Sequence, residues 1–240
     1  MTRERVARQK QAVRERMWRL LERRGVARFP GASGRIPNFE GAEAAAERLA
    51  GLPEWRDARV VKANPDAPQL PIRARALDEG KLLYMAVPRL ADPKPFLLLD
   101  PERLRESPRR SASIRGAARA GRPVASGEME RVDLVVCGTV ACNRRGVRVG
   151  KGGGFSDLEF ALLVEAGRLD ADATLATTVH PLQLLDRRLP ETEHDFRVQR
   201  IVTPESVIRT GARRRPPGIL WDHLDDQKVA AVPALTALRG

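Results

Sequence analysis

Apolar residues recur at helical spacing through a strongly charged segment at the start of the chain. Their spacing predicts one amphipathic helix over residues 3–24, ended by Gly25. Lys10 and Arg14 lie four positions apart in this segment, so the helix places both on one face. The apolar positions are Val6, Val13, Met17, Leu20 and Leu21.

Short β-branched runs alternate with helical segments along the rest of the chain. This alternation predicts an α/β fold with a largely parallel or mixed sheet. Residues 64–71 contain three prolines and are expected to form a rigid loop, whereas the arginine-rich stretch from residue 100 to about Gly127 is expected to be loose. The predicted strands cover residues 59–63, 81–87, 96–99, 132–137 and 173–179, and the predicted helices cover residues 42–50, 72–78, 158–166 and 222–231.

The chain has 240 residues, of which 42% are hydrophobic, and it can therefore bury a substantial core. We expect one domain over residues 1–210 and a C-terminal extension over residues 211–240. The extension is expected to pack on the domain, because Ile219, Leu220 and Trp221 are costly to leave in water.

The sequence contains no stretch that approaches the roughly 18 to 20 uninterrupted apolar residues of a membrane span. Its charged start also differs from a signal peptide, so a cytoplasmic protein without membrane contact is expected. Cys137 and Cys142 lack the Cys-x-x-Cys spacing of a zinc site. We expect them to be small core residues and not a disulfide scaffold or a metal cluster.

The chain is basic, with 43 Lys and Arg against 31 Asp and Glu and a net charge of +12. This charge is spread along the sequence, with clusters only near residues 109–122 and 213–215. Aromatic residues make up only 4% of the chain, too few to stack nucleic-acid bases. Nucleic-acid binding is therefore disfavoured as the main function, although a basic protein attracts polyanionic ligands such as nucleotides and polyglutamylated cofactors.

The most informative segment is Arg-Val-Gly-Lys-Gly-Gly-Gly-Phe-Ser-Asp at residues 148–157, between a predicted strand and a predicted helix. Its glycines let backbone amides approach an anion, and the helix N-terminus adds a positive dipole end. Arg148 and Lys151 could neutralise phosphate oxygens. The glycine spacing fits neither the Walker pattern nor the dinucleotide fingerprint. A phosphate-binding loop is the favoured interpretation, with a purely structural connector as the alternative.

Four further motifs accompany this loop: Lys10-x-x-x-Arg14, Val-Asp-Leu-Val at 132–135, Leu-Pro-Glu-x-x-His-Asp at 189–195 and Ile-Val-Thr at 201–203. In this order they resemble the 5-formyltetrahydrofolate cyclo-ligases, also called methenyltetrahydrofolate synthetases, and the similarity covers most of residues 5–210. The loop is similar to the family signature Arg-Leu-Gly-x-Gly-x-Gly-Tyr-Tyr-Asp. Residues 35–39 and 217–221 look more like a divergent branch, the methenyltetrahydrofolate synthetase domain-containing proteins.

The resemblance implies a three-layer sandwich of the NagB/RpiA/CoA transferase-like type and a ring closure that depends on ATP and Mg²⁺. In the family, ATP phosphorylates the formyl oxygen of 5-formyltetrahydrofolate. The neighbouring amine then attacks the activated carbon, and 5,10-methenyltetrahydrofolate, ADP and phosphate are released. A small-molecule partner, a reduced folate or related formyl compound, and a monomer or homodimer are expected.

The family's functional positions can be carried over one by one. The catalytic positions are Lys10, Arg14 and Arg148. The metal positions are Asp157 and Asp195. The substrate positions are Asp66 and Phe155. The nucleotide positions are Lys10, Arg14, Arg148, Gly150, Lys151, Gly152, Gly153, Gly154, Phe155 and Ser156.

Some of these residues also have simpler interpretations. Lys10 and Arg14 could be surface charge on an arginine-rich helix. Ser156 could cap the helix after the loop, while Asp157 could merely complement its dipole. Asp66 could be an ordinary residue of a proline-rich turn.

The chain also departs from the family pattern. Phe155 and Ser156 replace the tandem tyrosines, and Tyr84 is the only tyrosine. Residues 141–143 read Ala-Cys-Asn where the family has Ala-Phe-Asp. The nucleotide half of the signature thus survives better than the substrate half, which suggests a paralogue that uses ATP on another N-formyl or heterocyclic metabolite. A non-catalytic protein that binds RNA through its arginines is a further alternative.

Overall fold

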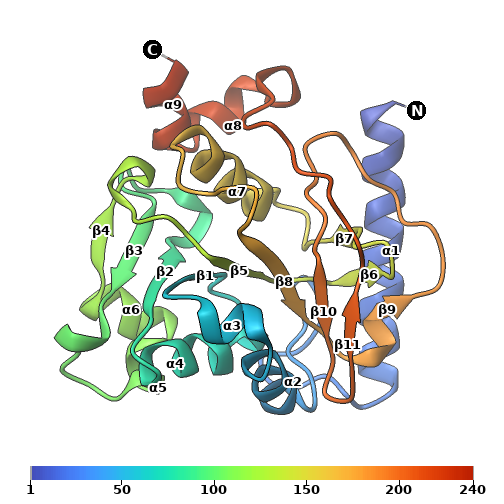
Figure 1. Ribbon diagram of the computed structural model, residues 1–240. Coiled ribbons are helices and arrows are strands. Elements are labelled where there is room, and N and C mark those ends of the chain that lie inside the picture. The colour runs from blue at the N-terminus through green and yellow to red at the C-terminus, as the bar shows by residue number, and fades with distance from the viewer. Residues whose placement is uncertain (1, 240) are drawn as a thin grey trace.

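A computed structural model describes residues 2–239, and its centre is a mixed eight-stranded sheet (Figure 1). The strands are β1 (Val60–Ala63), β2 (Leu82–Ala86), β3 (Phe96–Leu99), β4 (Arg122–Val124), β5 (Leu134–Cys137), β8 (Thr174–Thr178), β10 (Arg200–Val202) and β11 (Val207–Arg209). Their order is β11-β10-β8-β5-β1-β2-β3-β4. The five central strands are parallel, and the edges are completed by antiparallel pairs. The predicted α/β fold with a mixed sheet is confirmed.

Helices cover both faces of this sheet (Figure 1). One layer contains α2 (Ala42–Ala50), α3 (Pro53–Asp57), α4 (Leu70–Asp78), α5 (Pro108–Ser111) and α6 (Ile114–Ala120), and the other contains α7 (Phe155–Glu165), α8 (Asp226–Ala230) and α9 (Pro233–Arg239). Because strand side chains alternate between faces, Val135 and Val136 of β5 enter different hydrophobic clusters. The core is thus divided by the sheet into two layers.

A second, three-stranded sheet lies beside the N-terminal helix α1 (Arg3–Arg23). Its strands are β6 (Ala141–Asn143), β7 (Arg148–Val149) and β9 (Leu184–Leu185), in the order β7-β6-β9. Val13 and Met17 of α1 share a buried cluster with Val149 at the end of β7. This packing places the start of the chain next to the segment that leads into the glycine-rich loop.

Most elements predicted from periodicity are confirmed, and α2 and β3 have the predicted bounds. The prediction of a rigid loop over residues 64–71 is wrong in its second half, where η1 (Ala67–Gln69) leads into α4. Proline is compatible with the first turn of a helix, where its missing N–H is not needed. The predicted loose stretch before Gly127 is also wrong, because it contains α5, α6 and β4.

The C-terminal segment lies against α7. Val229, Val232 and Leu235 are buried, and the backbone N–H of Ile219 donates to Oε1 of Glu165 at 2.9 Å. The helix predicted over residues 222–231 is shorter than expected: α8 covers its second half, η6 (Trp221–His223) replaces its start, and α9 follows as a separate helix. Pro233 begins the last piece, since proline cannot continue α8 but suits the first turn of a new helix.

Both cysteines, Cys137 and Cys142, are buried and free, as predicted. No helix among residues 2–239 is long and apolar enough to cross a membrane.

Candidate active site

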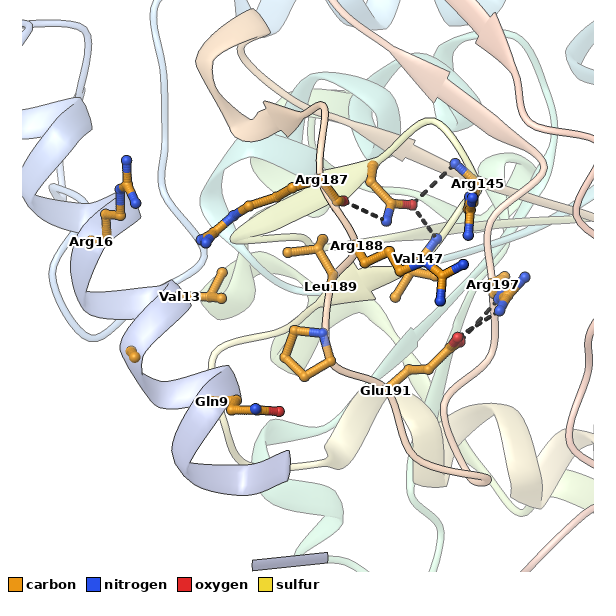
Figure 2. A pocket seen from close by; sticks show the side chains of 13 residues that line it. Gln9, Val13, Arg16, Arg145, Val147, Arg187, Arg188, Leu189, Glu191 and Arg197 are labelled. Atoms are coloured by element: carbon orange, nitrogen blue, oxygen red, sulfur yellow. Dashed lines mark hydrogen bonds and ion pairs between the residues drawn. The ribbon is translucent and has the colours of Figure 1, made fainter. Parts of the chain in front are cut away.

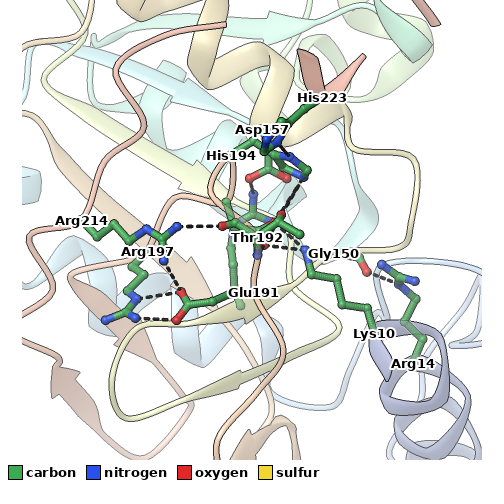
Figure 3. A network of polar contacts seen from close by, with 12 residues as sticks. Lys10, Arg14, Gly150, Asp157, Glu191, Thr192, His194, Arg197, Arg214 and His223 are labelled. Carbon is green, nitrogen blue, oxygen red and sulfur yellow. Dashed lines mark hydrogen bonds and ion pairs between the residues drawn. The ribbon is translucent and has the colours of Figure 1, made fainter. Parts of the chain in front are cut away.

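The helix α1 carries two of the predicted cations to the same place. Lys10 is buried and donates to Oδ1 and Oδ2 of Asp195 at 2.7 and 2.5 Å. Arg14, one turn further along, donates through Nε to the carbonyl of Gly150 at 2.7 Å. Figure 3 shows both side chains pointing from the helix toward the segments that carry these partners. Lys10 and Arg14 are therefore not surface charge, and their i, i+4 spacing explains why they act on neighbouring segments.

The glycine-rich loop ends at the N-terminus of α7. Gly152 and Gly154 have φ angles of +113° and +69°, in the region that side chains with a Cβ rarely adopt. A Cβ on Gly152 would lie 3.4 Å from Cζ of Arg14. Gly154 is the N-cap, and no side chain caps the helix. The first backbone N–H groups of α7 are thus available to an anion.

Ser156 does not cap α7, so that alternative is wrong. The helix begins earlier than predicted, at Phe155, and Ser156 lies within its first turn. Its hydroxyl accepts a hydrogen bond of 3.1 Å from Nδ2 of Asn64. Asn64 follows β1, so this contact ties the end of a central strand to the start of α7.

Arg148 is a buried cation at the base of the loop. Its Nη2 donates to Oδ1 of Asp157 at 2.7 Å, and its guanidinium lies 4.0 Å from the ring centroid of Phe196. Burial by itself would lower the pKa of Arg148, but Asp157 together with other negative groups nearby, Asp195 and Glu159 among them, raises that pKa above its usual value. Its Nε has no hydrogen-bond partner among the described residues. Asp157 therefore does more than complement the helix dipole, because it balances a buried charge.

Asp195 is held in place by its own loop. The backbone N–H and the hydroxyl of Thr192 donate to its Oδ2 at 2.5 and 2.8 Å. His194 contacts Thr192 at 2.9 Å and reaches His223 of η6 at 2.8 Å between the two Nδ1 atoms. Burial would raise the pKa of Asp195, but Lys10 and Thr192 keep it below its usual value. The carboxylate is therefore ionised at neutral pH.

The remaining predicted residues lie around the same loop. Lys151 donates to Oδ1 of Asp66 at 2.9 Å, which brings the proline-rich turn to the loop. Phe155 is half-buried, with the ammonium of Lys228 3.5 Å from its ring centroid. Tyr84 is buried elsewhere in the core, where its hydroxyl accepts from the N–H of Glu130. No tyrosine thus takes the place of the missing pair.

The acidic residues near the loop fit a magnesium ion that arrives with phosphate. Among residues 2–239 no group of three or more His, Cys, Asp and Glu side chains is arranged to hold a metal by itself. Mg²⁺ is commonly bound by one or two carboxylates together with substrate phosphates. Asp157 and Asp195 could supply those carboxylates, each being balanced by a cation, Arg148 or Lys10, in the present arrangement.

Sequence reasoning missed a buried polar group below the loop. Lys62 of β1 forms an ion pair with Glu159 of α7, and their side chains are 2% and 4% exposed. Asn64 also donates to Oε2 of Glu159, at 2.9 Å. Burial raises the pKa of Glu159, while Lys62 opposes that shift. A lysine inside an apolar strand was the available signal, since an unpaired charge is not tolerated there.

A cavity of about 750 Å³ opens on the neighbouring face of α1, beyond the loop that holds Asp195 (Figure 2). Asn143 organises its floor: Nδ2 donates to the carbonyl of Arg187 at 3.1 Å, and Oδ1 accepts from the N–H groups of Arg145 and Val147. Five arginines face this cavity: Arg16, Arg145, Arg187, Arg188 and Arg197. The departure of Asn143 from the family's aspartate thus has a structural role here.

Replacing Asn143 by alanine is expected to lower the free energy of unfolding by about 2 to 3 kcal/mol, since it leaves the buried N–H of Val147 without its partner and removes two part-buried hydrogen bonds, to Arg145 and Arg187. Urea unfolding followed by circular dichroism measures this change. The exposed Arg144→Ala variant next to it serves as a control, because its contact with Asp186 is a surface pair. An equal, small loss in both variants would contradict the role of Asn143.

Comparison with known proteins identifies relatives over nearly the whole chain. The model of the 5-formyltetrahydrofolate cyclo-ligase family matches residues 6–204. The methenyltetrahydrofolate synthase domain-containing protein of Mus musculus is 38% identical over 236 residues, 96% of this chain and 63% of that protein. The Homo sapiens protein of the same name is 34% identical, over 96% of this chain and 61% of its own length. The chain therefore spans less than two thirds of these relatives.

Solved structures support the fold. The NMR structure of Aquifex aeolicus 5,10-methenyltetrahydrofolate synthetase aligns with a TM-score of 0.52 at 19% identity, over 85% of this chain and 92% of that one. The likeness concerns the architecture, a mixed sheet between helical layers. The family itself is shown by the match over residues 6–204 and by the relatives at 34 to 38% identity. The chain belongs to the 5-formyltetrahydrofolate cyclo-ligase family.

Proposed function

We propose that this chain is an ATP- and Mg²⁺-dependent cyclo-ligase that converts 5-formyltetrahydrofolate to 5,10-methenyltetrahydrofolate, releasing ADP and phosphate. The observation that carries the proposal is an uncapped helix N-terminus preceded by glycines, where Arg14 bonds the loop and Arg148 bonds Asp157 in the first turn. Lys10, bonded to Asp195, lies close enough to oppose the rise that burial causes in the pKa of Asp157. Cations and free amides in that arrangement suit a polyphosphate. Membership of the family supports the same reaction class.

Each group has a defined task in this proposal. The loop amides and Arg14 would hold phosphate oxygens, while Lys10 and Arg148 would stabilise negative charge as the phosphoryl group moves. Asp157 and Asp195 would hold Mg²⁺, which when bound neutralises phosphate charge. The formyl oxygen then takes the γ-phosphoryl group, and the folate amine displaces phosphate as the ring closes.

Because it is buried, Arg148 would supply both a fixed positive charge and a free hydrogen-bond donor. Its ion pair with Asp157 at 2.7 Å keeps a permanent positive charge in a site shielded from water. Its orphaned Nε leaves one donor free, and an anionic ligand could satisfy it. The guanidinium is also oriented by the Phe196 ring, so little reorganisation would be needed when charge develops.

A changed substrate is the second candidate, and two contacts favour it. The Phe155 ring, which stands where the family has a tyrosine, is covered by the ammonium of Lys228. Asp66, at a family substrate position, is engaged by Lys151. Both contacts would have to rearrange for a folate ring to lie there, so another N-formyl or heterocyclic compound remains the alternative substrate.

The proposal also covers the domain organisation and the oligomeric state. We take residues 1–210 as a cyclo-ligase-like α/β domain, with the C-terminal extension, residues 211–240, packed on it, in a cytoplasmic monomer or homodimer. Size-exclusion chromatography with light scattering of the purified chain measures the oligomeric state.

The direct test is ATP turnover with Mg²⁺, with and without 5-formyltetrahydrofolate, following ADP and methenyl absorbance together. We expect both products to appear only when the folate is present and to cease when EDTA removes the metal. An Arg109→Ala variant is the control for site variants assayed in the same way, because Arg109 is exposed and pairs with Glu43 outside the site. Its turnover should equal that of the wild type. ATP binding without either product would favour the changed substrate, and absence of ATP binding would overturn the proposal.

A further inference from the structure

Two cations from opposite ends of the chain hold the glycine-rich loop. Arg14 of α1 donates to the carbonyl of Gly150 at 2.7 Å. Lys228 of α8 donates to the carbonyl of Gly153 at 2.8 Å, and its ammonium lies 3.5 Å from the ring centroid of Phe155. The loop between these carbonyls is the segment that precedes the free amides of α7, so any anion bound there would have a cation on each side.

Arg14 and Lys228 differ from the other cations of the site. Lys10, Arg148 and Lys151 each form an ion pair with a carboxylate: Asp195, Asp157 and Asp66 respectively. Within residues 2–239 neither Arg14 nor Lys228 forms such a pair. Their partners are neutral: backbone carbonyls, the amide of Gln11 and an aromatic ring.

Neither cation is therefore in direct contact with a carboxylate, although Asp195 and Asp225 act on Arg14 and Lys228 from a greater distance. Burial lowers the pKa of Arg14 and of Lys228, because each is partly removed from water. A partly desolvated cation gains more from an anion than from a neutral oxygen, since a full opposite charge adds Coulombic attraction to the hydrogen bond. The Gly153 carbonyl and the Phe155 ring are weaker partners than a phosphate oxygen would be.

The backbone of Lys228 is well anchored. Its N–H donates to Oδ1 of Asp225 at 2.6 Å, which caps α8, and the adjacent Val229 is buried in the main core cluster. The position lies outside the residues 6–204 that match the family model. A contribution from Lys228 would therefore be a feature of the C-terminal segment and not of the matched region.

We propose that Lys228 is a nucleotide-binding residue of this protein, which exchanges the Gly153 carbonyl for a phosphate oxygen when a polyphosphate occupies the loop. This inference rests on the proposed function, because it takes the loop as the phosphate site. Only the flexible end of the side chain has to turn, since the ammonium is already within hydrogen-bond distance of the loop. One hydrogen bond replaces another in this step, and no covalent bond is made or broken.

Calorimetric titration of ATP with Mg²⁺ into the full chain tests the proposal. We expect Lys228→Met to weaken ATP binding about tenfold, equivalent to about 1.4 kcal/mol, and Lys228→Arg to retain most of the affinity. Lys94→Met is the matched control, because Lys94 is exposed and pairs with Glu128. The difference between wild type and Lys228→Met should narrow as salt is raised, since salt screens a partly exposed charge.

Chemical labelling of the unmodified chain gives a second readout that a merely structural role would not move. Lysines are acetylated briefly with and without saturating ATP and Mg²⁺, and each site is quantified by mass spectrometry. We expect ATP to reduce labelling of Lys228 several-fold and to leave Lys94 unchanged. Equal ATP affinity in wild type and Lys228→Met, or equal labelling of Lys228 with and without ATP, would overturn the inference. Failure of the wild type itself to bind ATP would instead overturn the proposed function.

Discussion

Replacing Arg148 by alanine is expected to reduce ATP-dependent turnover by about 10² to 10³-fold, the usual cost of removing one preorganised donor from a site of charge development. Arg148 is the only predicted phosphate-binding cation that is fixed by both an ion pair and an aromatic ring. Steady-state rates of ADP release, with ATP affinity measured by calorimetry, check the expectation.

The same substitution leaves the Asp157 carboxylate buried without its partner. Breaking a buried pair from one side typically costs about 3 to 5 kcal/mol of stability, so loss of activity could reflect unfolding. The double variant Arg148→Met with Asp157→Asn removes both charges and serves as the control. It should regain stability but not turnover. An Arg148→Ala variant that is folded and binds ATP with unchanged affinity would contradict the assignment of the phosphate loop.

Replacing Lys62 by methionine is expected to lower the free energy of unfolding by about 3 to 5 kcal/mol. Its partner Glu159 is 4% exposed, and burial already raises the pKa of that carboxyl. Without the lysine, only Asn64 donates to Oε2 of Glu159. Urea unfolding at pH 7, followed by circular dichroism, measures the loss.

A second variant separates the charge from the packing. Lys62→Met combined with Glu159→Leu replaces the buried pair by apolar side chains of similar volume, and such replacements are often neutral or stabilising. The double variant should therefore recover most of the stability. This double variant also removes the acceptor that Asn64 has on Glu159. Asn64 keeps its hydrogen bond to Ser156, which links the end of β1 to the first turn of α7. If Lys62→Met is as stable as the wild type, the pair does not hold α7 in place.

The outline of the fold could be predicted from local pattern. The helix α1 follows from apolar periodicity, whereas the strands β1, β2, β3, β5 and β8 follow from short continuous runs of apolar and β-branched residues. The strands β6, β7, β9, β10 and β11 are two or three residues long. A run of that length carries no period, so only its hydrogen-bonded neighbours define it as a strand.

The residues at the loop also divide into those with a local sequence signal and those recognised only from contacts in the folded chain. The glycines of residues 150–154 and the paired spacing of Lys10 and Arg14 are local signals, and the expectation that both concern one site rested on family resemblance. Lys228 carried no such signal, and Lys62 showed only that a charge stands in an apolar strand, because their partners, Gly153 and Glu159, are 75 and 97 residues away.

Sequence alone was enough to locate a glycine-rich loop before a helix, an α/β fold and a family, because each depends on residues close together in the chain. Tertiary structure decided which charge meets which. It paired Lys10 with Asp195, Arg148 with Asp157 and Lys62 with Glu159, and it left Arg14 and Lys228 on backbone carbonyls. The physical reason is that a buried charge is stable only beside a compensating group, and the sheet order and the packing of α1 and α8 determine which group that is.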